Sequence, residues 1–194
     1  SVRTITSVIE KNLYGNGYTI NLNFETENPG STLYFKGEIT VNNVIFKGYN
    51  FLSPSDPLSK LIGEPSIVDV SASVDEINKV TFKNCIFNGG NKGIYVKNSD
   101  VTLSGCIVIN TYEGGITVSS NGVDYPNTNI LVKNSVFEKC LVGAVLISCE
   151  NIHNKNNIPL KVTFEGVGRI FNWQPVGAYN GLTLSGLLGS GNDY

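Results

Sequence analysis

Val80-Thr-Phe-Lys-Asn-Cys-Ile-Phe87 indicates the fold of this chain, because close copies of it recur along the sequence. In each copy apolar and polar residues alternate, a bend residue interrupts the alternation, and a short second run follows. The other copies are Ile39-Thr-Val-Asn-Asn-Val-Ile-Phe46, Val101-Thr-Leu-Ser-Gly-Cys-Ile-Val108, Ile130-Leu-Val-Lys-Asn-Ser-Val-Phe137 and, less perfectly, Val162-Thr-Phe-Glu-Gly-Val-Gly-Arg169. Intervals of roughly 20 to 40 residues are typical of one supersecondary unit stacked on copies of itself, because a single unit cannot bury its own apolar face.

The alternation predicts a strand with one buried face, followed by a sharp bend. The bend position is always Asn or Gly, the residues that best tolerate a left-handed backbone; its occupants are Asn43, Asn84, Gly105, Asn134 and Gly166. A companion pattern lies between the copies, at Leu33-Tyr-Phe35, Val68-Asp-Val70, Ile94-Tyr-Val96, Ile116-Thr-Val118, Val145-Leu-Ile147 and Leu182-Thr-Leu184. Three short strands per turn therefore predict a coil whose strands pair in parallel with the next coil, so that like residues stack in columns.

These features resemble the right-handed parallel β-helix, or pectin-lyase-like, superfamily. The resemblance rests on the repeated pattern, the Asn/Gly bend and the opening Ile9-Glu-Lys-Asn-Leu-Tyr-Gly-Asn-Gly-Tyr-Thr-Ile20. We therefore expect an all-β fold, a right-handed parallel β-helix (solenoid) of about five to six coils. An antiparallel sandwich is the competing architecture, but a sandwich does not need residues at fixed positions in successive copies.

The domain organisation is expected to be simple. Residues 1–194 form a single β-helix domain, and residues 170–194 form a C-terminal cap, because Arg169 breaks the column of aromatic residues and Trp173 follows it. The chain has no Met and begins with Ser1, which favours a piece of a larger protein. The resemblance implies that this larger protein is secreted, on the cell surface or part of a virion.

Composition excludes some partners. The net charge is −2 and only 15% of the residues are charged, so the chain lacks the basic excess that neutralises phosphates, and no nucleic acid partner is expected. No apolar run approaches the length of a membrane span.

A candidate binding row lies on the companion strands. Their outward positions carry Tyr34, Asp69, Tyr95, Thr117, Leu146 and Thr183. Two tyrosines and a carboxylate in line suit a polysaccharide, since an aromatic ring offers an apolar face and a polar tip. Tyr125, in a nearby turn, joins Tyr34, Asp69 and Tyr95 as a candidate binding residue. The competing interpretation is that Tyr simply has a high β-propensity on a half-exposed sheet.

Candidate catalytic residues are few. Asp69 is the one carboxylate within the regular companion strands, and Asp75 and Asp124 are its candidate partners, because a glycoside hydrolase needs two carboxyl groups. The resemblance implies Asn-Thr-Asp, Asp-Asp and Gly-His-Gly motifs in hydrolases, and the sequence contains none of them. The lyases it implies use an Arg or Lys base, and the chain has only Arg3 and Arg169 as arginines. His153 is the sole histidine and has no second imidazole for a metal site, so no metal or cofactor is expected.

Two further columns concern packing and assembly. Cys85 and Cys106 share one position in adjacent coils and are expected to be buried, reduced thiols. Ile45, Ile86, Ile107 and Val136 share a position that alternation directs outward, and an exposed apolar ladder usually marks an interface. The ladder is therefore expected either to join identical chains or to be covered by Leu182-Thr-Leu-Ser-Gly-Leu-Leu188.

Three functions remain open from the sequence. The first is a non-catalytic β-helix module of an exported, surface or virion-associated protein that binds a glycan, oligomerises, or does both. The second is a polysaccharide lyase or glycoside hydrolase of pectin-lyase-like fold acting through Asp69. The third is a purely structural spacer. The missing catalytic motifs favour the first hypothesis.

Overall fold

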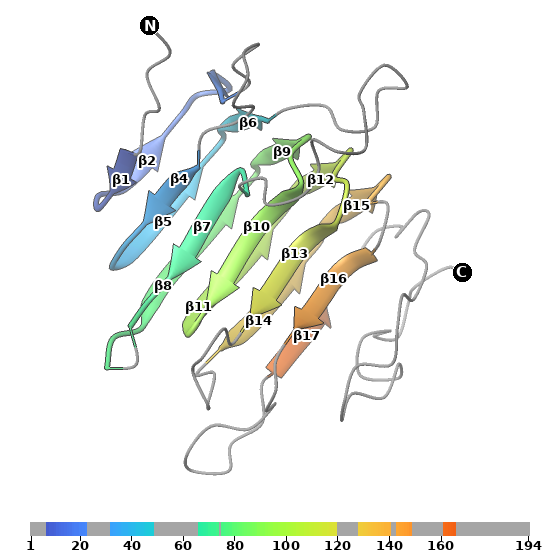
Figure 1. The fold of residues 1–194 in the computed structure, drawn as a ribbon. Helices are drawn as coiled ribbons and strands as arrows, with labels where there is room; N and C mark the ends of the chain where they lie inside the picture. Colours follow the sequence, from blue (N-terminus) through green and yellow to red (C-terminus); the bar gives the residue numbers. More distant parts are fainter. Residues whose placement is uncertain are drawn as a thin grey trace, which may run out of the picture.

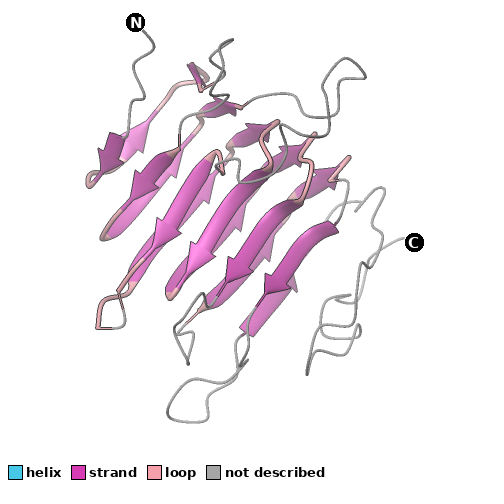
Figure 2. Cartoon of the chain, viewed as in Figure 1, coloured by secondary structure: helices cyan, strands magenta, loops and turns pink. Residues whose placement is uncertain are grey.

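A computed structural model describes residues 7–22, 32–48, 66–73, 75–119, 128–140, 143–148 and 161–165. These residues form only strands, turns and loops (Figure 2). In this part of the chain no helix is long and apolar enough to cross a membrane. Arg169, Trp173 and the predicted cap at residues 170–194 lie outside the described residues.

The strands form three sheets in which every pairing is parallel (Figure 1). The companion sheet contains β1 (Ser7–Ile9), β4 (Leu33–Phe35), β7 (Val68–Ser71), β10 (Lys92–Lys97), β13 (Gly114–Ser119) and β16 (Gly143–Ser148), in that order. The main sheet contains β2 (Leu13–Tyr14), β5 (Glu38–Asn42), β8 (Asn78–Lys83), β11 (Ser99–Ser104), β14 (Asn129–Lys133) and β17 (Lys161–Glu165). The short sheet contains β3 (Thr19–Asn21), β6 (Ile45–Lys47), β9 (Ile86–Asn88), β12 (Ile107–Ile109) and β15 (Val136–Glu138).

This topology confirms the predicted parallel β-helix of about five to six coils. The chain passes from companion sheet to main sheet to short sheet and repeats, so each strand pairs with its counterpart in the next coil. The opening stretch that carried part of the resemblance, Ile9 to Ile20, falls within the first coil, β1 to β3. There Leu13 pairs with Val41 and Ile20 with Phe46.

Equivalent residues of the copies pair directly, as the stacked-column prediction requires. Val80 pairs with Ile39 on one side and with Val101 on the other. In the short sheet Phe87 pairs with Phe46 and with Val108. A slip of one residue would turn every inward side chain outward, so this register keeps the apolar residues in the core.

The bend between main and short strands has the predicted conformation. Its φ angle is 54° at Asn43, 52° at Asn84, 64° at Gly105 and 46° at Asn134. An L-residue in this left-handed region is strained, and Asn and Gly carry the smallest cost. The repeated Asn/Gly is therefore a backbone requirement; Gly166 lies outside the described residues.

Aromatic packing dominates the centre of the core. Phe82 is fully buried, and its ring contacts three others edge to face, with centroid distances of 5.4 Å to Phe35, 6.3 Å to Phe46 and 5.1 Å to Phe87. Phe46 and Phe87 stack in register at 5.1 Å. These four rings come from two adjacent coils and all three sheets, so they tie the sheets together.

The described cysteines are buried and free, which confirms the prediction for Cys85 and Cys106. Each donates its thiol hydrogen to main-chain oxygens, Cys85 to Lys83 (3.3 Å) and Cys106 to Phe82 (3.3 Å). Burial raises the pKa of Cys140 to about 11, so this thiol is protonated at neutral pH and is not a ready nucleophile. Cys149 lies outside the described residues.

Candidate functional site

The predicted binding row exists as a continuous line across the outer face of the companion sheet. Tyr34 pairs in register with Asp69, Asp69 with Tyr95, and Tyr95 with Thr117. The line begins at Val8, which pairs with Tyr34, and ends at Leu146, which pairs with Thr117. Sequence reasoning missed Val8, because the first coil departs from the repeat. Thr183, Tyr125 and Asp124 lie outside the described residues.

Exposure changes along this row. Val8 is 45% exposed, and Tyr34, Asp69 and Tyr95 are half-buried. Thr117 and Leu146 occupy the predicted outward positions, but they are only 2% and 6% exposed, so they are covered rather than open to solvent. Part of the reason is Gly114: a β-carbon there would lie 2.9 Å from Leu146 Cδ1 and 2.9 Å from Thr117 Oγ1. Both side chains lie over the space that this glycine leaves, and the accessible row therefore runs from Val8 to Tyr95.

Asp69 is the carboxylate of the row. Burial raises its pKa above the usual 3.8, and two neighbours oppose this shift: Ser71 donates its hydroxyl to Asp69 Oδ1, and Lys97 adds a positive charge. The carboxyl group is thus held in place by Ser71 and partly shielded from water. A group in this setting can accept hydrogen bonds from a ligand without first being reoriented.

The raised pKa of Asp69 predicts how stability depends on pH. Because the folded protein holds this proton more tightly than the unfolded chain, stability falls as pH rises from about 3.8 through the folded pKa. We expect Asp69→Asn to change the free energy of unfolding more favourably at pH 7 than at pH 3. At each pH the variant is compared with the native chain. Urea unfolding at both pH values measures this. Ser71→Ala is the control. Loss of the Ser71 hydrogen bond should raise the pKa of Asp69 further, so this variant should lose more stability between pH 3 and pH 7 than the native chain does. An effect of Asp69→Asn that is the same at both pH values would contradict the raised pKa of Asp69.

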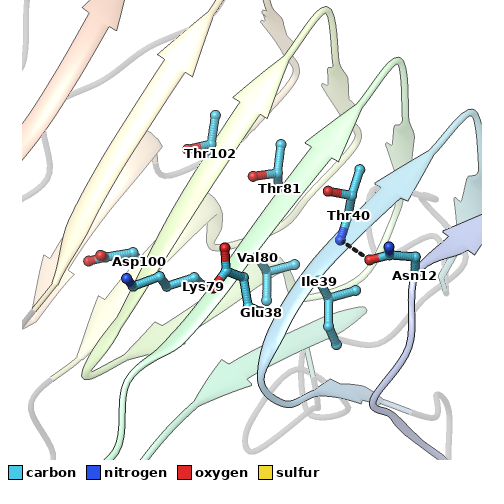
Figure 3. A pocket seen from close by; sticks show the side chains of 9 residues that line it. All are labelled: Asn12, Glu38, Ile39, Thr40, Lys79, Val80, Thr81, Asp100 and Thr102. Atoms are coloured by element: carbon cyan, nitrogen blue, oxygen red, sulfur yellow. Dashed lines mark hydrogen bonds between the residues drawn. The ribbon is translucent and has the colours of Figure 1, made fainter.

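A second candidate site is a groove on the outer face of the main sheet, with a volume of about 530 Å³ (Figure 3). Thr40, Thr81 and Thr102 form a ladder in it, each in register with the next. Figure 3 shows their side chains in a common orientation, with the hydroxyl oxygens toward the same side. Within the described residues no hydrogen bond engages these three hydroxyls.

A charged row runs beside the threonine ladder. Lys79 pairs in register with Glu38 on one side and Asp100 on the other. Asp100 Oδ1 accepts hydrogen bonds from Asn129, from the main-chain N at 3.1 Å and from Nδ2 at 2.8 Å. Sequence reasoning missed this groove. The three threonines stand at one fixed position of three copies, but the alternation of apolar and polar residues predicts only that they point outward, not that they line a groove.

The apolar ladder on the short sheet is also in register. Ile86 pairs with Ile45 and with Ile107, which pairs with Val136. Ile107 is 38% exposed, and the other three are half-buried. The stretch Leu182 to Leu188, the alternative cover, lies outside the described residues.

Metal ligands do not gather in the described part of the chain, where no group of three or more His, Cys, Asp or Glu side chains could hold an ion. His153 lies outside it.

Known proteins provide no independent evidence on this fold. The sequence matches no protein-family model, no curated protein and no solved structure. The parallel β-helix thus rests on the sheets described above, and membership of the pectin-lyase-like superfamily stays a prediction from the resemblance.

Proposed function

We propose that the chain is a non-catalytic β-helix module that binds a glycan along the outer face of the companion sheet. The observation that carries the proposal is the accessible row Val8, Tyr34, Asp69 and Tyr95, in which each residue is in register with the next. The resemblance to parallel β-helices favours an exported, surface or virion-associated parent protein. Detection of the parent protein on the cell surface, in the medium or in virions tests that part.

The chemistry of the row suits a sugar. Tyr34 and Tyr95 lie on either side of Asp69, two strand spacings or about 10 Å apart. Aromatic faces pack against the C–H surface of a sugar ring, while a carboxylate accepts hydrogen bonds from its hydroxyl groups. A chain of sugar units lying across the strands would meet an aromatic ring, a carboxylate and a second ring in turn.

The alternative function is a polysaccharide lyase or glycoside hydrolase with Asp69 as acid. Its raised pKa fits an acid, but hydrolysis needs a second carboxyl group across the scissile bond. Of the two candidates, Asp75 is exposed in the connection between β7 and β8, and Asp124 lies outside the described residues. Turnover of a polysaccharide that Asp69→Asn abolishes would favour this alternative.

Self-association is a second candidate function, favoured by one observation. The apolar ladder of the short sheet spans four coils in register, and Ile107 keeps 38% of its surface exposed. Apolar patches of this kind commonly mark interfaces. Sedimentation equilibrium that returns a monomer at all concentrations would remove this candidate.

The glycan proposal is tested by Tyr95→Ala on a glycan array. We expect at least about a tenfold loss of affinity for any glycan that the native chain binds, because an aromatic contact and its buried area are removed. Tyr14→Ala is the matched control, since Tyr14 is 64% exposed and lies on the main sheet. Equal binding by both variants, or no glycan binding by the native chain, would contradict the proposal.

A further inference from the structure

We infer that the groove on the main sheet is a second binding site, for a neutral polysaccharide chain lying across β5, β8 and β11. This site does not depend on the companion-sheet row, because it lies on a different sheet. It is built from the threonine ladder of Thr40, Thr81 and Thr102 and from the charged row beside it.

The threonines give the groove a repeating amphipathic surface. Each side chain carries a methyl group and a hydroxyl, and Figure 3 shows the hydroxyls on one side of the ladder. A hydroxyl both donates and accepts hydrogen bonds, and the described residues leave all three without a partner. A sugar chain has the same character, with hydroxyl groups and C–H faces repeated along its length.

The charges of the groove select against anionic chains. Two carboxylates, Glu38 and Asp100, flank one ammonium group, Lys79, so the lining carries an excess of negative charge. Nucleic acids and polyuronates need the opposite sign. An apolar small molecule is also disfavoured, since the exposed side chains of the groove are polar and such ligands need an apolar lining.

A peptide strand cannot use this face in the usual way. An added strand binds through main-chain groups at the edge of a sheet. Here β8 is paired with β5 on one side and with β11 on the other, so its main-chain groups are already engaged. The ligand must therefore be recognised through side chains, as a polyhydroxylated chain would be.

The ends of the ladder set the length of the site. Thr40 and Thr102 are two strand spacings apart, about 10 Å. Beyond Thr40 lies Asn12, whose Oδ1 accepts a hydrogen bond from the Thr40 main-chain N at 2.8 Å. Beyond Thr102 the row continues with Leu131, which offers no hydroxyl. We expect affinity to rise with oligosaccharide length and to level off once the chain spans these positions.

The test records threonine methyl NMR spectra of the whole chain while neutral oligosaccharides are added. The probes are β-1,4-glucan, β-1,3-glucan, xylan and mannan fragments, from the disaccharide to the hexasaccharide, with a hexagalacturonate as the anionic probe. We expect at least one neutral series to shift the Thr40, Thr81 and Thr102 signals, and the anionic probe to shift none. Tyr95→Ala should leave these shifts unchanged, which separates this site from the companion-sheet row.

Thr81→Val is the deciding variant, because it removes one hydroxyl and keeps the shape. We expect about a fivefold loss of affinity, the size of one hydrogen bond. Thr163→Val is the matched control, since Thr163 lies in the same row beyond Leu131 and is also half-buried. The inference is overturned if no neutral probe shifts the ladder, if the hexagalacturonate binds it equally well, or if both variants bind alike.

Discussion

Replacing Phe82 by alanine is expected to lower the free energy of unfolding by about 3–5 kcal/mol, the usual cost of removing a buried aromatic ring. Phe82 has no exposed surface, and its ring meets those of Phe35, Phe46 and Phe87 edge to face. The cavity would open where the three sheets meet, and paired parallel strands on either side leave the site little freedom to collapse. Guanidinium unfolding followed by far-UV circular dichroism measures the loss.

Phe164→Ala is the matched control for this prediction. Phe164 occupies the same position of the repeat in β17, but it is only partly buried against the core. Its loss should cost clearly less, since part of its surface already contacts water. Equal losses for the two variants would mean that the aromatic cluster does not stabilise the core as its geometry indicates.

The fold could be predicted because every coil repeats one physical requirement. A strand that pairs in parallel with its own copy needs the same residue type at the same position, and Val80 pairs with Ile39 and Val101 accordingly. The bend needs a left-handed residue, so Asn84 and Gly105 stand at corresponding positions. Such requirements are local and periodic, and they are visible in one sequence.

The candidate sites could be predicted only in part, because exposure depends on neighbours in other coils. Register placed Tyr34, Asp69 and Tyr95 in one row, as predicted. The burial of Thr117 and Leu146 was not predictable from alternation, since Gly114 contributes space beside them. The groove was missed for a similar reason: its shape arises from three strands together.

Asn98 is a residue whose role no sequence pattern revealed, because it stands outside the repeated position. It turns the chain between β10 and β11 with a φ of 48°, and it is only 1% exposed. Its Nδ2 donates to the main-chain oxygens of Ser73 and of Glu76, the latter at 3.0 Å. Asn98, in the turn between β10 and β11, thus holds the connection between β7 and β8 in the preceding coil.

We therefore expect Asn98→Ala to lower the free energy of unfolding by about 2–4 kcal/mol. About 1–2 kcal/mol comes from forcing a left-handed conformation on alanine, and the rest from the two part-buried hydrogen bonds to the Ser73 and Glu76 carbonyl groups, which lose their donor. Asn98→Gly should relieve only the first contribution. Chemical unfolding of both variants measures the two parts separately.

Asn84→Ala is the control for the backbone contribution, because Asn84 has a φ of 52° but an exposed side chain. It should cost only about 1–2 kcal/mol. Hydrogen exchange adds a local readout, since the Glu76 amide bonds to the Ser73 oxygen that Asn98 also contacts. Exchange at Glu76 should speed up in Asn98→Gly and stay unchanged in Asn84→Ala. If Asn98→Gly were as stable as the native chain, with Glu76 still protected, the side chain would not be what holds this connection.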